Sequence, residues 1–395
     1  MLRLYILFAA IYLIEGITEV PFILNVYLRN VLEFEPSRIG NILFLGGIWF
    51  VVVKPVVGLL ADGWRRFNTR LALVIGLACS AGGWAIIANA NSPQAMLIGI
   101  SLKIMAIAVL DVLIDGMIVA TSTARNRSFI QSLVYGCRFG GAMLTAEVAG
   151  GMIGDGAAAF VQIYYFYSLL ALAALLPVLL FRREEVESRQ SLESKGGLDV
   201  TQQDDVPLGQ RLRQLVNPAF GWLLALYVLY NFGPDTSTFF DPILEERFSS
   251  QFLGRINVIY YLGTLAGILL FPLLRLRVGV KTMFFVSLIG WSLVEISCLW
   301  ISEANGALIY CSAGLFNAFS ELALLTVAAA MCKIRGIQTF AFASALSVGN
   351  LIFETGKPLG GCLLEAVGIE WLFVISALCG FLPFLVLHRI DFRKV

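Results

Sequence analysis

Residues 95–120 read AMLIGISLKIMAIAVLDVLIDGMIVA, an apolar run in which the charged side chains are Lys103, Asp111 and Asp115. A helix that crosses about 30 Å of hydrocarbon needs roughly 20 residues, so the run predicts a membrane-spanning helix. Charged side chains at that depth are costly, and they lie where they meet a partner or line a cavity. The run therefore predicts both a membrane protein and a polar site inside it.

The composition of the whole chain agrees with this prediction. Of the 395 residues, 58% are apolar and 14% are charged, whereas a soluble domain has about 45–50% and about 25%. The net charge of +1 excludes a basic surface for nucleic acid. A single histidine and seven cysteines without a C-x-x-C pair exclude a histidine-based metal site and a zinc site. We expect an all-α integral membrane protein with no metal and no cofactor.

Eleven other apolar runs bring the predicted number of spans to twelve. The approximate spans are 4–28, 38–60, 71–90, 95–120, 129–154, 161–181, 217–241, 251–274, 282–301, 305–331, 338–366 and 368–388. The first span begins within a few residues of Met1, so no separate signal peptide is expected.

The distribution of Lys and Arg predicts the orientation. With the N-terminus inside, 20 of the 28 basic residues fall in cytoplasmic segments, four fall on the opposite side and four lie inside spans. Because cytoplasmic loops carry the excess of basic residues, both termini are expected in the cytoplasm. The polar segment 182–216 has linker composition. It divides the chain into two six-helix bundles, predicted at 1–181 and 217–395.

Four acidic residues in the N-terminal half are spaced as pairs. Glu15 and Glu19, like Asp111 and Asp115, are four residues apart and share a helix face. Two poorly hydrated carboxylates one turn apart repel each other, and this repulsion favours the protonated form. Asp111, Asp115 and Glu19 are candidates for carrying a proton; pairing of each acid with a base on a neighbouring helix is the alternative.

Arg138 is the best candidate for an anion contact. It has no acid three or four residues away, so its partner comes from another helix or from a ligand. The planar guanidinium suits a carboxylate or a phosphate. The other candidate substrate ligands are charged or aromatic side chains inside spans: Lys54, Lys357, Glu354, Asp111, Asp235, Tyr135 and Tyr230. Glu354 and Lys357 are three residues apart, and a pair between them is the alternative to a substrate role.

Three prolines mark places where spans are expected to break. Pro21 follows Glu19, Pro55 follows Lys54, and Gly233-Pro234 precedes Asp235. A proline frees a backbone carbonyl, and such sites at membrane depth line cavities.

A short segment between the second and third spans resembles a known transporter family. Residues 58–66, GLLADGWRR, are similar to the signature of the major facilitator superfamily at this position. The resemblance implies that fold, with Asp62, Arg65 and Arg66 at a cytoplasmic gate.

Further segments resemble a narrower family, the folate–biopterin transporters. The segment 54–62 is similar to its K-P-x-x-G-x-x-x-D motif, Asp111–Asp115 to its D-V-x-x-D helix, and 131–138 to its Q-S-x-x-W-G-x-R stretch, with Tyr135 in place of Trp. In the second half, Cys332, Gly336, Thr339, Phe340, Ala341, Ser347 and Asn350 follow the family's order. The resemblance implies a pterin or folate-like anion as substrate.

The sequence thus predicts a monomeric secondary transporter, not an enzyme, in the inner or plasma membrane. It is expected to move a small organic anion by alternating access with proton symport, or with another coupling ion. The alternatives are a carrier for a muropeptide, acyl-CoA or another solute, and a receptor or assembly factor of the same fold that does not transport.

Overall fold

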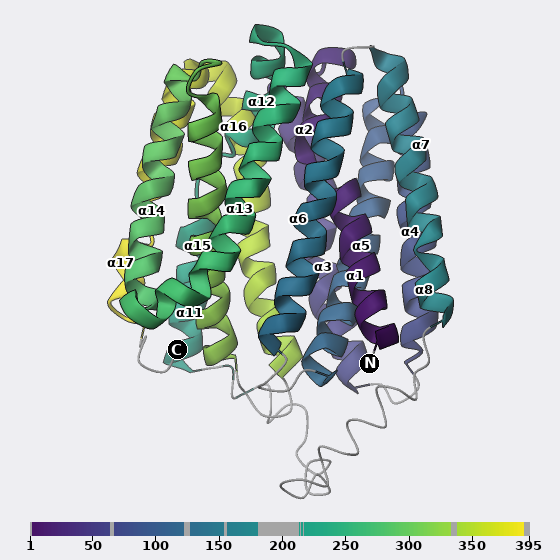
Figure 1. Cartoon of the computed structure of the whole chain (residues 1–395), viewed down its shortest axis with the longest axis vertical. Helices are drawn as coiled ribbons and strands as arrows, with labels where there is room; N and C mark the ends of the chain where they lie inside the picture. The colour runs from purple at the N-terminus through teal and green to yellow at the C-terminus, as the bar shows by residue number, and fades with distance from the viewer. Residues whose placement is uncertain are drawn as a thin grey trace, which may run out of the picture.

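The computed structural model describes residues 2–63, 67–121, 127–153, 156–180, 213, 215, 217–332 and 338–390. Figure 1 shows long helices that run side by side. The N-terminal helices are α1 (Leu2–Thr18), α2 (Pro21–Val26), η1 (Tyr27–Val31), α3 (Pro36–Gly63), α4 (Thr69–Ala88), α5 (Pro93–Thr121), α6 (Arg127–Met152), α7 (Ala157–Ala173) and α8 (Leu175–Leu180). The C-terminal helices are α11 (Pro218–Asn231), α12 (Ser237–Arg247), α13 (Ser250–Val278), α14 (Val280–Ser297), η4 (Cys298–Trp300), α15 (Gly306–Met331), α16 (Gln338–Cys379) and α17 (Phe384–Leu387).

Within the described residues, nine helical stretches are long and apolar enough to cross a membrane. One of them, Phe340–Leu387, contains both of the last two predicted spans, and these meet at Gly368, whose φ of 82° lies outside the helical range. Two further predicted spans are not among the nine. The helix α6 carries several charges, and the helix α11 ends after only 14 residues. The all-helical membrane fold is confirmed, and the number twelve stays a prediction.

Two of the three expected breaks are present. The first span is interrupted at Glu19 and Val20, between α1 and α2, and the seventh at residues 232–236, between α11 and α12. The expectation of a break at Pro55 is wrong, because α3 continues as one helix through it. A proline removes one backbone hydrogen bond, and the packing of α3 against α5 and α16 keeps this helix continuous.

Local sequence signals set where several helices begin. The side chains of Asn68, Asn217 and Ser249 accept hydrogen bonds from the backbone amides of Leu71, Phe220 and Phe252 at 3.1, 2.8 and 3.1 Å. Each of these N-caps satisfies one of the free amides of a first helical turn.

The N-terminal helices lie together on one side of Figure 1 and the C-terminal helices on the other. The two groups meet where α3 packs along α16 and α6 along α13. A Cβ atom on Gly150 would lie only 2.6 Å from the Cα of Gly254, so these two glycines let α6 and α13 cross closely. The predicted linker 182–216 lies outside the described residues apart from 213 and 215.

Polar contacts between the two groups gather at the end of the molecule that is farther from the labelled termini (Figure 1). There the Asn30 side chain donates to Glu245 at 2.7 Å, and the backbone amide of Ser37 donates to Glu365 at 2.8 Å. The start of α1 and the end of α17 both lie towards the opposite end, one in each half of the molecule. Which end faces the cytoplasm stays a prediction.

Candidate functional site

An ion pair between α1 and α6 supplies the partner that the sequence left open for Arg138. Its Nη2 lies 2.9 Å from Oε1 of Glu15. The Glu15 side chain is only 7% exposed, whereas that of Arg138 is 37% exposed. Gly16 lies directly against the carbonyl of Arg138, and Gly141 lies against that of Leu13, so the helices approach closely. The guanidinium is therefore bound to Glu15 on α1, and the Arg138 side chain remains partly exposed.

A second pair joins α3 to α5. Lys54 Nζ lies 2.9 Å from Asp111 Oδ2, and both side chains are about a tenth exposed. The same ammonium lies 3.7 Å from the centre of the Phe50 ring. Two of the candidate substrate ligands thus bind each other in this structure.

Asp115, one turn after Asp111, meets a different partner. The hydroxyl of Tyr12 on α1 donates to its Oδ1 at 2.5 Å. Tyr12, Glu15 and Glu19 are spaced by three and four residues, so one face of α1 contacts α5 and α6. Of the two acids on α5, Asp111 therefore binds an ammonium group and Asp115 binds a phenol hydroxyl.

Glu19 lies where α1 ends. Its two carboxylate oxygens are 2.9 and 3.1 Å from Lys103 Nζ on α5. That ammonium also lies 4.5 Å from the centre of the Trp84 ring on α4. The interruption of the first span therefore carries an ion pair.

In the C-terminal half, Glu354 and Lys357 pair within α16, with a distance of 2.6 Å between Oε2 and Nζ. A Cβ atom on Gly47 of α3 would overlap the Glu354 carboxylate, so the pair lies at the contact between the two halves. This is the local pairing that the spacing of the two residues allows.

The interrupted seventh span holds the last two candidate ligands. Asp235 accepts hydrogen bonds from the side chains of Ser237 and Thr238 at 2.8 and 2.5 Å, and its backbone amide donates to the Gly356 carbonyl at 2.9 Å. Tyr230 shares a 2.8 Å hydrogen bond with Ser320. Asp235 thereby closes the turn that leads into α12.

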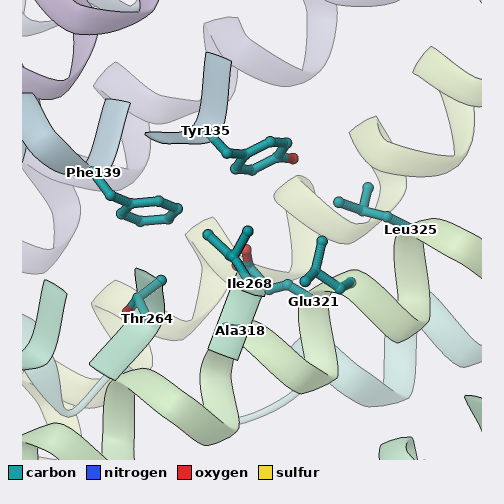
Figure 2. A pocket seen from close by; sticks show the side chains of 8 residues that line it. Tyr135, Phe139, Thr264, Ile268, Ala318, Glu321 and Leu325 are labelled. Carbon is teal, nitrogen blue, oxygen red and sulfur yellow. The ribbon is translucent and has the colours of Figure 1, made fainter. Parts of the chain in front are cut away.

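A pocket of about 220 Å³ lies between the two halves. Figure 2 shows the rings of Tyr135 and Phe139 on one side, facing Ile268 and Glu321 from the other half. The remaining lining residues are Thr264, Ala318, Leu322 and Leu325. Tyr135, predicted from the sequence, lines this pocket three residues before Arg138.

One part of the predicted site lies outside the described residues, and four residues of the site were not predicted. The gate residues Arg65 and Arg66, and the side chain of Asp62, lie outside the described residues. Glu15, Tyr12, Phe139 and Glu321 were not among the predicted site residues. The spacing of Glu15 and Tyr12 with Glu19 could have pointed to the first two, and Glu321 is an acid inside the predicted span 305–331. Nothing in the local sequence marks Phe139.

The fold and the charged interior can now be compared with known proteins. The family model of the Major Facilitator Superfamily matches residues 4–254, and the chain belongs to this superfamily of membrane transporters. A comparison with curated proteins gives no match.

Solved structures agree on the fold. The chain is similar to the crystal structure of the nucleoside transporter NupG, with 17% identity, a TM-score of 0.73 and 98% of each chain covered. A point mutant of NupG gives a TM-score of 0.76 with 99% of each chain covered, again at 17% identity. The human organic anion transporter MFSD10 gives a TM-score of 0.64 at 14% identity, with 98% of this chain and 99% of that chain covered. The family indicates a transporter, which is not an enzyme.

Proposed function

We propose that this transporter moves a pterin or folate-like anion across the inner or plasma membrane, coupled to protons. The observation that carries the proposal is the guanidinium of Arg138, held by Glu15 at 2.9 Å, on the helix that also lines the pocket between the halves. A bidentate donor on the helix that carries two aromatic rings of the pocket suits a substrate with a flat ring and a carboxylate. The neighbouring structures, a nucleoside transporter and an organic anion transporter, are compatible with this substrate class.

Coupling follows from the partners of Arg138. A proton on Glu15 would break its ion pair with Arg138, and the guanidinium would then be free for the carboxylate of the substrate. Asp115, Asp111 and Glu19 are the further proton candidates, each bound to one partner from another helix. Substrate and proton would thereby favour the same state, which is what symport requires.

Alternating access would use the two six-helix halves, 1–181 and 217–395, as rocking units joined by the linker 182–216. The contacts Asn30–Glu245 and Ser37–Glu365 join the two halves at one end in this structure. We assign that end to the outside and the termini to the cytoplasm. Asp62, Arg65 and Arg66 would then close the cytoplasmic end in the other state, with the protein working as a monomer.

The remaining predicted ligands meet protein partners in this structure. Lys54 binds Asp111, Lys357 binds Glu354, Tyr230 binds Ser320, and Asp235 binds Ser237 and Thr238. Their roles as substrate ligands stay predictions, each of which requires that the substrate displaces such a partner.

The test is counterflow in proteoliposomes that contain the purified full chain. Pterins, folates, nucleosides, muropeptides and acyl-CoA are offered one at a time, with and without an imposed proton gradient. We expect counterflow of a pterin or folate and accumulation only with the gradient. Counterflow that is confined to another class would replace the substrate, accumulation without the gradient would exclude proton symport, and binding without any counterflow would indicate a receptor.

A further inference from the structure

In the part of the chain that the structure describes, one carboxylate of the pocket between the halves lacks a protein partner. Glu321, on α15, lines the pocket, and its side chain is exposed to it. Among the residues that the structure describes, it forms no hydrogen bond and no ion pair. The cation that acts on it is Arg138 on α6, and that guanidinium is paired with Glu15. Glu321 is therefore an acceptor left open to whatever fills the pocket.

The walls around Glu321 select for a flat group. The rings of Tyr135 and Phe139 are nearly parallel, with 24° between their planes and 6.2 Å between their centres. Ile268 and Leu325 supply aliphatic surface from the other half (Figure 2). The hydroxyl of Thr264 already donates to the Tyr260 carbonyl at 3.0 Å. The pocket thus offers aromatic and aliphatic faces and one strong acceptor.

The size of the pocket limits what enters it. The pocket is narrow in this structure, and its empty space of about 220 Å³ includes space that is open to solvent. A ring system therefore enters it when the two halves move apart, as alternating access requires.

Other carboxylates nearby are poorer acceptors for such a ring. Asp111 binds Lys54 at 2.9 Å and Asp115 binds Tyr12 at 2.5 Å, so a ligand would have to displace a partner. At Glu321 the two oxygens can accept two parallel N–H groups at once.

We propose that Glu321 determines specificity by accepting the paired N–H donors of a planar heteroaromatic ring, the 2-aminopyrimidinone edge that pterins and guanine share. The ring lies between Tyr135 and Phe139 on one side and Ile268 and Leu325 on the other. This inference rests on the proposed transport function and names the part of the substrate that the pocket recognises.

The test compares two ligands and three forms of the purified full chain in nanodiscs. The ligands are pterin and its analogue in which hydrogen replaces the 2-amino group; the forms are wild type, Glu321→Gln and the matched control Glu147→Gln, an exposed acid on α6. We expect wild type and Glu147→Gln to bind pterin about 10- to 100-fold more tightly than the analogue, since a hydrogen bond to a charged group contributes that much. Glu321→Gln, whose amide offers one acceptor oxygen, is expected to bind the two ligands within about threefold of each other.

Discrimination that survives in Glu321→Gln would overturn the inference, even if pterin is transported. The inference would also be overturned if Glu147→Gln lost the discrimination between the two ligands, or if the wild type bound both ligands equally or bound neither. Guanosine is the second ligand tested. If its binding also requires Glu321, the pocket recognises the 2-aminopyrimidinone edge that pterins and guanine share, and the counterflow assay then decides whether a pterin or a nucleoside is the substrate. Monodispersity and thermal stability of each variant show whether it is folded.

Discussion

The two halves of the molecule hold buried charge in different ways. In the N-terminal half, Glu15, Glu19 and Asp111 each pair with a basic side chain from another helix. In the C-terminal half, Glu354 pairs within its own helix, and Glu295 accepts hydrogen bonds from the Thr236 hydroxyl at 3.2 Å. Glu321 has no such partner among the described residues. The N-terminal half therefore joins its charges by ion pairs between helices, whereas the described ion pair of the C-terminal half lies within one helix and Glu295 depends on a neutral donor.

This difference has a mechanical consequence. A pair between two helices is strained or broken when the helices shift, and protonation of its acid can in turn shift them. A pair within one helix moves with that helix. We therefore expect coupling to depend on the N-terminal pairs and ring recognition to depend on Glu321. The following predictions separate the two halves, beginning with the largest expected effect.

Replacing Arg138 is expected to have the largest effect. Arg138→Gln should lower uptake at least roughly 30-fold, because one partner of a charge pair is lost together with the proposed anion contact. Radiolabelled uptake in cells that lack endogenous folate transport measures it, with Arg255→Gln, an exposed arginine on α13, as the control. Uptake near the wild-type level would remove Arg138 from the site.

Replacing Glu15 tests coupling separately from binding. Glu15→Gln should keep substrate binding, because Arg138 is then permanently released, and should lose most of the roughly tenfold or greater accumulation that a proton gradient drives. Counterflow and gradient-driven uptake, measured on the same liposomes, separate the two effects. Gradient dependence equal to that of wild type would place the coupling site elsewhere, at Asp115, Asp111 or Glu19.

The pair between Lys54 and Asp111 is expected to contribute mainly to stability. Lys54→Met and Asp111→Asn should each destabilise the protein by about 3–5 kcal/mol, because each leaves a buried partner uncompensated, and the double variant should cost less than the sum. Thermal unfolding of the detergent-solubilised wild type, single variants and double variant measures this double-mutant cycle. Strict additivity would mean that the two side chains act independently.

Tyr12→Phe is expected to have an intermediate effect on uptake. It removes the hydroxyl that donates to Asp115, and a hydrogen bond to a carboxylate contributes about 1.5–3 kcal/mol. Uptake should fall roughly tenfold or more. Tyr165→Phe, which removes a hydroxyl bonded to Asn89 on the exposed surface, is the matched control and should stay near wild type; equal losses in the two variants would contradict a specific role for Tyr12.

The smallest effect is expected from the local pair of the C-terminal half. The double variant Glu354→Gln with Lys357→Gln should change stability by about 1 kcal/mol or less, because both charges are removed together and neither is left buried without its partner. Uptake should stay within about threefold of wild type. A loss as large as that of Arg138→Gln would show instead that this pair belongs to the substrate site.

Part of the site could be predicted from the sequence because helix geometry is local. The spacing of Asp111 and Asp115 placed both on one face of α5, and the spacing of Glu354 and Lys357 allowed the pair that forms. The isolation of Arg138 in its own helix correctly required a partner from elsewhere. Pro21 and Gly233-Pro234 marked two real interruptions, whereas Pro55 did not, because packing held α3 together.

The sequence by itself determined the class of protein. A chain with 58% apolar and 14% charged residues must place its scarce internal charges next to partners or cavities. Only the tertiary structure decided which charges meet: Glu15 with Arg138 on α1 and α6, and Lys54 with Asp111 on α3 and α5. It also placed Glu321 opposite Tyr135 and Phe139 (Figure 2). Helical spacing relates residues three or four positions apart, whereas contacts between helices far apart in the chain depend on how whole helices pack, and no local pattern encodes that packing.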